Sequence, residues 1–226
     1  MKFLLLFPVI LLSFIASGQQ LSQVMISGGT TLSAFSIITN QKVLIRISAE
    51  GKVIEWGTDP GIGRYNYYTG QLQPYLDRVE YYGASEYDSV LRGKVKAIGT
   101  STLTYYGSSE NEAKKGKLKS IGSLQLDYFL DFENRDNKGK LKSIGYAALD
   151  YYSSFDNESF RNKLKTVGNT TLSWYSSFDD KLIKGKIKTI GTFNYTWYSS
   201  HEINGYGGLK SGLPAQNVNG VFYIIR

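Results

Sequence analysis

The chain has 226 residues, of which 42% are hydrophobic and 20% charged, with a formal net charge of +7 and no cysteine. This composition excludes an intrinsically disordered chain and a disulfide-stapled miniprotein, and it fits one or two folded domains. There are 18 tyrosines but a single histidine, His201, so most catalytic and metal-binding templates are disfavoured.

Residues 1–18 have the features of a secretory signal peptide. Lys2 supplies the basic start, mostly apolar residues follow from Phe3 to Ala16, and small side chains precede a cleavage site near Gly18. The apolar run is shorter than the ~20 residues that a membrane helix needs, and no later segment is a candidate span. We therefore expect a secreted, periplasmic or cell-surface protein without a transmembrane helix in the mature chain. The alternative is an uncleaved N-terminal anchor or a buried helix.

An internal repeat with a period of 23 residues dominates the rest of the chain. Two looser copies, GKVIEWG at 51 and GQLQPYL at 70, precede the regular units, and residues 208–211 resemble a truncated unit. A gap-free period of this length is typical of stacked supersecondary units, each too small to bury its own apolar face. The regular units begin with GKVKAIG at 93, GKLKSIG at 116, GKLKSIG at 139, NKLKTVG at 162 and GKIKTIG at 185.

Each unit contains two tracts rich in β-branched, leucine and aromatic residues, which predict two short β-strands. A glycine separates them, as in Gly99-Thr100 and Gly122-Ser123, and suits a type II′ turn because glycine adopts positive φ. We therefore favour one β-hairpin per unit. The alternative treats the glycine as a bulge in one long strand, because alternate positions stay largely apolar from Leu118 to Leu130. It gives an antiparallel meander or barrel.

The expected fold class is an all-β, elongated repeat sheet of stacked β-hairpins. We interpret residues 19–69 as an N-terminal cap with a degenerate first repeat, residues 70–207 as the 23-residue β repeats, and residues 208–226 as a C-terminal capping strand. Terminal units of a repeat array need such caps because they lack a neighbour on one side.

Within the caps, two segments have clear strand patterns. Val43–Ser48 and Lys52–Trp56 predict a hairpin, and residues 221–225 predict a final strand that closes the exposed edge of the sheet. For residues 19–42, the sequence does not decide between a first strand pair and a loose leader.

Basic side chains concentrate in the repeats, where residues 93–211 carry 18 basic and 12 acidic groups. Ten lysines form two columns, and lysines two apart on a strand share one face, so we expect a lysine array along one side. One interpretation is a solvated face that blocks aggregation and pairs with an acid column of the neighbouring loops. The other is binding of an anionic polymer, with acidic polysaccharide or lipid headgroups favoured over nucleic acid. The columns are Lys94, Lys117, Lys140, Lys163, Lys186 and Lys96, Lys119, Lys142, Lys165, Lys188; the acids are Glu110, Glu133, Asp156, Asp179 and Glu202.

Aromatic pairs recur at a fixed place in each unit, and adjacent residues of a strand point to opposite faces. The favoured interpretation is cross-strand stacking within the core of the array. The alternative is a ladder of exposed rings that binds sugars or other flat ligands. The pairs are Tyr105-Tyr106, Tyr128-Phe129, Tyr151-Tyr152, Trp174-Tyr175 and Trp197-Tyr198, and the second residue of each pair, with the two lysine columns, forms the candidate binding set: Tyr106, Phe129, Tyr152, Tyr175 and Tyr198.

An aromatic doublet followed by a Gly-Lys-Leu-Lys-x-x-Gly block resembles bacterial variants of MORN repeats, over about residues 51–212. That resemblance implies β-hairpin units of similar length stacked into an elongated sheet. MORN repeats usually carry an Asn-Gly turn after the aromatics, where this chain has an eight-residue polar loop. A weaker similarity exists to choline-binding and toxin-type cell-wall repeats, whose Gly-Trp before the lysine is missing here. Either family implies a non-enzymatic scaffold or surface-binding module.

No catalytic, metal or cofactor site is predicted. His201 lies in a column that holds Phe132, Phe155 and Phe178, so a structural position is expected rather than a general base. One loop contains a cluster of calcium-type ligands but lacks the fixed glycine and terminal glutamate of a calcium loop. Its members are Asp131, Glu133, Asn134 and Asp136.

Together these patterns predict an exported, non-enzymatic repeat protein with a binding or scaffolding role at the cell envelope or outside the cell. The expected partner is an anionic or aromatic-stacking polysaccharide, or a surface protein. The alternative is a small outer-membrane β-barrel, suggested by alternating tracts and abundant tyrosine, although two lysine columns fit a lipid-facing band poorly. An enzyme using carboxylates of the variable loops is a third possibility. Ligand identity, biological process and oligomeric state stay open.

Overall fold

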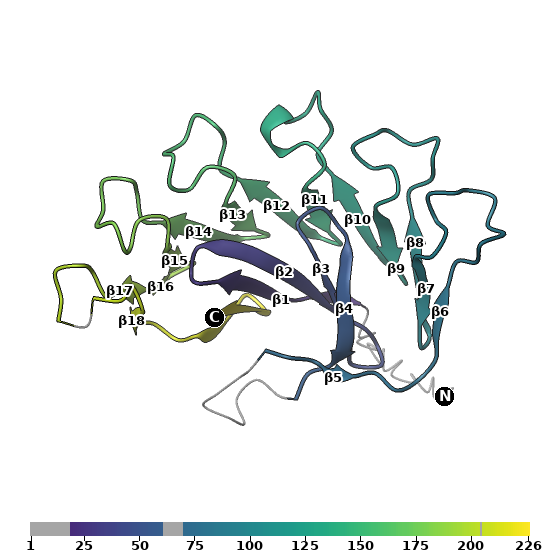
Figure 1. Ribbon diagram of the computed structural model, residues 1–226, viewed down its shortest axis with the longest axis horizontal. Helices are drawn as coiled ribbons and strands as arrows, with labels where there is room; N and C mark the ends of the chain where they lie inside the picture. The colour runs from purple at the N-terminus through teal and green to yellow at the C-terminus, as the bar shows by residue number, and fades with distance from the viewer. Residues whose placement is uncertain (1–18, 61–69, 204) are drawn as a thin grey trace, which may run out of the picture.

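The computed structural model describes residues 19–60, 70–203 and 205–226, and the predicted signal peptide lies outside them. The described residues form an all-β protein of two sheets, with a short two-stranded ribbon at one end (Figure 1). One short 3-10 helix, η1 (Arg135–Asn137), is the helical element of this part of the chain. Across these same ranges, no helix has the length and apolarity needed to cross a membrane.

The repeats form an 11-stranded antiparallel sheet, here called the repeat sheet. Each unit is a hairpin of two short strands, as predicted. The glycines between the strands have φ between 53° and 57°, and the residues after them are not in the positive-φ region, as a type II′ turn requires. The continuous-strand alternative is therefore wrong. The strands are β6 (Val79–Tyr81), β7 (Val95–Ile98), β8 (Ser101–Tyr105), β9 (Leu118–Ile121), β10 (Leu124–Tyr128), β11 (Leu141–Ile144), β12 (Ala147–Tyr151), β13 (Leu164–Val167), β14 (Thr170–Trp174), β15 (Ile187–Ile190) and β16 (Phe193–Asn194).

Every unit carries one β-bulge, and the residue that bulges is a lysine of the second column. Between units one and two, for example, Thr104 pairs with Ser120 and Tyr105 with Leu118, so Lys119 has no opposite residue. The same shift recurs in the ribbon of β17 (Thr196–Trp197) and β18 (Leu209–Ser211), which continues the array as a partial unit. The bulges at the other units lie at Lys96, Lys142, Lys165, Lys188 and Lys210.

The segments on either side of the array form a second sheet in the order β19-β20-β1-β2-β3-β4-β5. The predicted hairpin is present as β3 and β4, and residues 19–42 supply the strand pair β1 and β2. Most of GKVIEWG at 51 lies in β4, and residues 73–74 form β5, so both segments belong to the second sheet. The looser copy that begins at residue 70 supplies only its second strand, β6, to the repeat sheet. The strands are β1 (Gln20–Ser27), β2 (Thr31–Ile38), β3 (Val43–Ile47), β4 (Val53–Thr58), β5 (Gln73–Pro74), β19 (Ala215–Val218) and β20 (Val221–Ile225).

The final strand does not close the edge of the repeat sheet, contrary to the prediction. Instead β20 lies between β19 and β1, antiparallel to the first and parallel to the second. Its sequence VFYII has no polar alternation, and Tyr223, Ile224 and Ile225 are buried. A strand that is apolar on both faces is stable inside a sheet rather than at an exposed edge.

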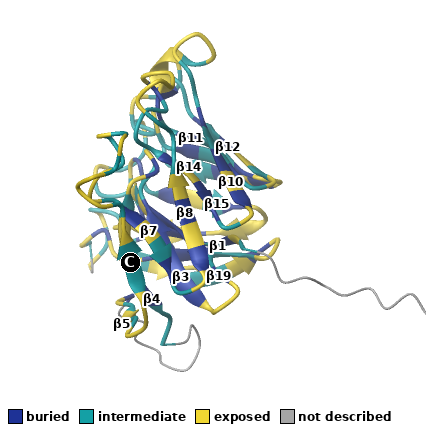
Figure 2. Ribbon diagram, turned by 90° about the vertical axis from the view of Figure 1, so that its right-hand side faces the viewer, coloured by how far each residue is buried: buried dark blue, intermediate teal, exposed yellow. Residues whose placement is uncertain are grey.

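The second sheet covers one face of the repeat sheet, and the two enclose a common core. Ile26, Phe35 and Ile45 of the second sheet pack in one cluster with Leu103 and Leu126 of the repeat sheet. Buried residues gather on the strands, whereas the connecting loops are exposed (Figure 2). The array is therefore one layer of a two-layer protein, with one face buried and one face open to solvent.

Two hairpin turns of the second sheet dock on the repeats through main-chain hydrogen bonds. Ala49 O, in the β3–β4 turn, accepts from Leu141 N at 2.7 Å, and Gly29 O, in the β1–β2 turn, accepts from Ile187 N at 2.7 Å. At Gly51, beside the first of these contacts, an added Cβ would lie 1.8 Å from Tyr128 Oη. These turns fix which units the second sheet meets.

Candidate functional site

The two lysine columns lie on opposite faces of the repeat sheet, so the predicted single lysine face is wrong. The first column precedes its strand, which begins one residue later, and the bulge then displaces the second column. Regular alternation of side chains therefore does not link the two lysines of a unit. Lys163 of the first column reaches Thr30 O of the second sheet, whereas Lys119 of the second column is exposed.

The first column is half-buried between the sheets and bonded there. Lys140 Nζ donates to Asn137 Oδ1 at 2.9 Å, and Lys163 Nζ donates to Gly185 O at 2.7 Å. Each lysine also lies over the first aromatic ring of its own unit, as Lys186 does at 4.3 Å from the Trp197 ring. Burial lowers the pKa of Lys163 to about 8, and it lowers the pKa of Lys117, Lys140 and Lys186 as well.

The second column lies on the open face, and every lysine of it except Lys142 lies beside the second aromatic ring of the preceding unit. Lys119 Nζ is 5.5 Å from the Tyr106 ring centroid and Lys188 Nζ is 5.4 Å from that of Tyr175. Lys142 instead pairs with Glu133 at 2.5 Å. Lys210 belongs to this column too, but a strict 23-residue spacing misses it because the last loop is one residue shorter.

The two aromatics of each pair fill the open end of a hairpin. The first ring is mostly buried, and in four of the five pairs it bonds to its own hairpin, as Tyr128 Oη does in donating to Leu118 O at 2.6 Å. Tyr151 Oη has no hydrogen-bond partner among the described residues. The second ring reaches the next unit, as Tyr106 Oη does in donating to Leu126 O at 3.0 Å, and contacts Tyr128 edge to face. The candidate residues Tyr106, Phe129, Tyr152, Tyr175 and Tyr198 are therefore half-buried. This geometry supports the structural interpretation of the aromatic columns.

The loops are held to one another by a column of Asp and Asn residues that the sequence reasoning missed. Asp180 Oδ1 accepts from Leu182 N in its own loop and from Ser200 N in the next loop, at 2.9 and 3.0 Å. The Ser200 hydroxyl also donates to the Asp180 carboxylate, and this bond together with the two main-chain bonds lowers the pKa of Asp180 to about 2. Asn157 makes the same pair of bonds to Ser159 N and Ser177 N. The signal was the 23-residue spacing of Asp88, Asn111, Asn134, Asn157 and Asp180.

Four of the five residues of the acid column accept hydrogen bonds from main-chain N–H groups within their own loops. Asp156 Oδ2 accepts from Ser153 N at 2.7 Å and Asp179 Oδ2 from Ser176 N at 2.6 Å. Glu202 accepts from Ser199 N and also pairs with Lys210. The expected pairing of acids with second-column lysines is therefore present at some units, beside a turn-closing role.

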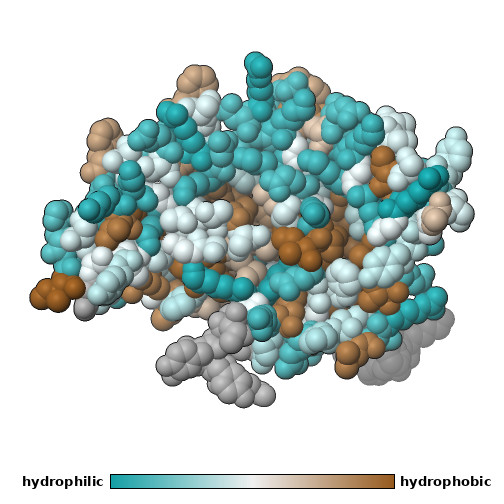
Figure 3. Space-filling model, viewed as in Figure 1, coloured by the Kyte–Doolittle hydropathy of each residue, from teal (hydrophilic) through white to brown (hydrophobic). Residues whose placement is uncertain are grey.

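Three phenylalanines at the loop tips are almost fully exposed, although their column was interpreted as structural. The exposed fractions are 82% for Phe132, 96% for Phe155 and 93% for Phe178, and His201 in the same column is also exposed. Apolar side chains accordingly protrude from the mostly hydrophilic loop edge in Figure 3. An exposed large apolar side chain repeated on consecutive units is informative, because isolated ones are common but regular ones are not.

The described residues contain no cluster of three or more His, Asp or Glu side chains that could hold a metal ion. In the loop with calcium-type ligands, Asp131 pairs with Lys138 at 3.5 Å and Glu133 with Lys142. Asn134 and Asp136 accept main-chain N–H groups. Comparison of the chain with protein-family models, with curated proteins and with solved structures finds no match.

Proposed function

We propose that this protein is an exported, non-enzymatic binding protein that holds an extended, neutral polysaccharide along its loop edge. The exposed rings of Phe132, Phe155 and Phe178 carry the proposal, since three consecutive units each present one ring. Flat sugar rings stack on exposed aromatic faces, and a polymer of such rings is matched by a row of them.

The rigidity of the loops supports this proposal. Asn157 and Asp180 each tie their own loop to the next one, and Asp136 does the same by accepting from Ser154 N at 2.7 Å. Fixed rings lose little conformational entropy when a ligand stacks on them, so preformed loops favour binding. The loop edge is therefore better suited to a ligand than the packed second aromatics are.

The charge of the loops favours a neutral ligand. Residues 130–139, 153–162 and 176–185 carry five basic and seven acidic side chains. An acidic polymer would gain no net attraction at this edge. The exposed lysines of the open face offer a second candidate surface, for an anionic polymer, because Lys96, Lys119 and Lys188 are exposed there. Lys96 and Lys119 lie one unit apart, at about 9.5 Å for two strand spacings, and Lys188 lies three units further on.

The test is binding of residues 19–226, which include every described strand, to a glycan array at low and high salt. Three variants separate the surfaces. The first changes Phe132, Phe155 and Phe178 to Ala; the second changes Lys96, Lys119 and Lys188 to Gln; and the control is Tyr146→Ala, which removes an exposed ring from a hairpin turn.

We expect salt-insensitive binding to neutral glycans that the Phe variant loses and the other two keep. Salt-sensitive binding lost only in the Lys variant would assign function to the open face instead. Absence of binding to every glycan would overturn the polysaccharide proposal. Export is tested separately by N-terminal sequencing of protein recovered outside the cytoplasm, which should begin at Gln19.

A further inference from the structure

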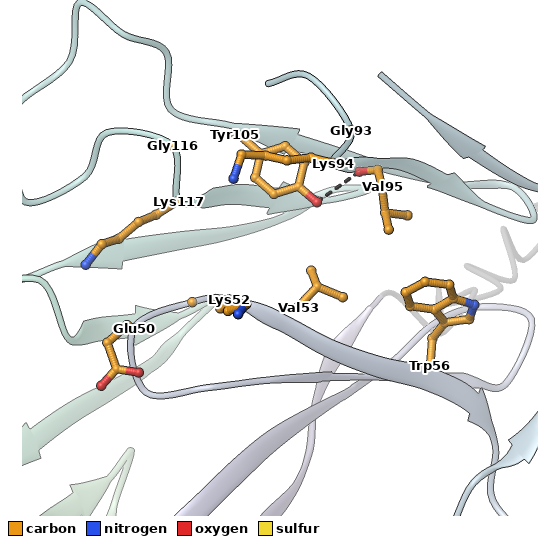
Figure 4. A pocket seen from close by; sticks show the side chains of 11 residues that line it. Glu50, Lys52, Val53, Trp56, Gly93, Lys94, Val95, Tyr105, Gly116 and Lys117 are labelled. Carbon is orange, nitrogen blue, oxygen red and sulfur yellow. Dashed lines mark hydrogen bonds between the residues drawn. The ribbon is translucent and has the colours of Figure 1, made fainter. Parts of the chain in front are cut away.

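A cleft of about 430 Å³ lies between the two sheets at the first two repeat units. Its volume falls within the ~300–1,000 Å³ of ordinary small-molecule sites. Lys94, Val95 and Tyr105 form one wall, and Lys52, Val53 and Trp56 of the β3–β4 hairpin form the opposite wall (Figure 4). This cleft is separate from the loop edge and from the open face.

The other repeat units show what the inner side of a unit binds. At units three and five, a turn of the second sheet places a carbonyl oxygen on the N–H of Leu141 and of Ile187, both at 2.7 Å. At unit one, Val95 holds the equivalent position and lines the cleft, and no acceptor from the described part of the second sheet reaches its N–H. The second sheet therefore satisfies this donor with an oxygen atom at units three and five, whereas at unit one, as at units two and four, no described second-sheet oxygen reaches it.

The lysine of unit one differs from its column in the same way. Lys117, Lys140, Lys163 and Lys186 each donate to a main-chain carbonyl of the following unit. Lys94 has no hydrogen bond or ion pair from its ammonium group within residues 19–60, 70–203 and 205–226, and lies only beside the Tyr105 ring at 5.3 Å. Lys94 and Val95, which are adjacent in the chain, thus both line the cleft, and no oxygen atom of the described part of the second sheet accepts from Lys94 Nζ or from Val95 N–H.

The remaining walls define the body of a ligand. Trp56, Val53 and Tyr105 are partly buried and supply flat, mainly apolar surface, while Lys52 adds a second ammonium (Figure 4). Glu50 lies at the far end beside Lys117, where the two charges attract each other. We infer that the cleft binds a small carboxylate with a flat apolar ring, its oxygens on Lys94 Nζ and Val95 N–H and its ring against Trp56.

The probe is phenylacetate, titrated into residues 19–226 and followed by amide chemical shifts, with the neutral isostere phenylacetamide beside it. We expect the Val95 amide to shift with phenylacetate while the Leu141 amide, already bonded to Ala49 O, stays unchanged. The amide ligand should bind about tenfold more weakly, because a hydrogen bond to a charged group contributes ~1.5–3 kcal/mol. Equal binding of acid and amide, or no shift at Val95 with either ligand, would overturn the inference.

Lys94→Met and Lys186→Met are a matched pair, since each removes one ammonium of the same column. Lys94→Met should weaken phenylacetate binding about tenfold, and Lys186→Met should leave it unchanged. If both variants weaken binding alike, the site is not this cleft. The wild-type amide shifts decide the question even if a variant fails to fold, and glycan binding at the loop edge can succeed or fail independently.

Discussion

The two sheets bury similar side chains, but their strands pair over different separations in the sequence. In the repeat sheet every strand pairs with its neighbours in the chain, and one glycine turn, one bulge and one pair of rings recur in each unit. In the second sheet Met25 pairs with Ile224, across the whole array. Because its contacts are local, the repeat sheet can be predicted from the sequence. The second sheet depends on the repeat sheet, because its strands pair across a large separation in the chain.

We expect the largest effect from substitutions in the core that the two sheets share. Ile45→Ala in the second sheet and Leu126→Ala in the repeat sheet should each cost about 2–5 kcal/mol, because both side chains are buried in one cluster. Tryptophan fluorescence and far-UV circular dichroism should report one coincident denaturant transition in each variant. Two separate transitions would mean that the sheets fold as independent units.

The docking turn offers the next largest effect. Gly51→Ala should cost about 3 kcal/mol, since Gly51 has φ of +74° and its new Cβ would collide with Tyr128 Oη. Gly168→Ala is the control, because Gly168 also has positive φ but nothing lies within 4 Å. It should cost only ~1–2 kcal/mol, the backbone part alone. Equal losses in chemical denaturation would show that the turn does not need this close approach.

The inner and outer lysines differ in their response to alkali. The pKa of Lys163 falls from 10.5 to about 8 on folding, so between these values the unfolded chain binds more protons and stability rises with pH. The free energy of unfolding should therefore increase from pH 7.5 to 9.5, below the ordinary tyrosine pKa. Lys163→Met should reduce that increase and Lys165→Met, on the open face, should not. An identical pH profile for both variants would contradict the burial of the inner column.

The smallest effect concerns the loops. Asp180 has a pKa of about 2 because Ser200 and Leu182 donate to it, so its contribution is present above its ordinary value of 3.8 and is lost as pH falls towards 2. The protection factors of the Ser200 and Leu182 amides, which are the exchange rates corrected for the intrinsic rate at each pH, should fall over that range. Glu158→Gln, in a neighbouring exposed loop position, serves as the control and should leave both rates unchanged.

The sequence predicted the repeat sheet because its signals are local. A glycine at fixed spacing gave the hairpin turn, and the aromatic pairs pointed to packing between units. Two things lay beyond such signals. Strand β20 pairs with β1 through contacts that no local pattern encodes, and the bulge at Lys96 and its equivalents breaks the alternation on which the single lysine face was based.

For the candidate binding residues too, the local pattern could be predicted and the non-local contacts could not. Periodicity found the lysine and aromatic columns, but exposure depends on what covers each face. The rings of Phe155 and Phe178 stand free, whereas those of Tyr152 and Tyr175 reach across to the next unit. The spacing of all four is equally regular, so spacing alone could not separate packed rings from free ones.

The two docked turns make the second sheet sensitive to the number of repeat units. In most tandem arrays a unit can be duplicated or lost by recombination with little penalty, since each repeat touches only its neighbours. Here the carbonyl oxygens of Ala49 and Gly29 accept hydrogen bonds from units three and five, and β20 must pair with β1 after the last unit. A change in the number of units would misalign these three contacts, so we expect the second sheet to pair with only one number of repeats.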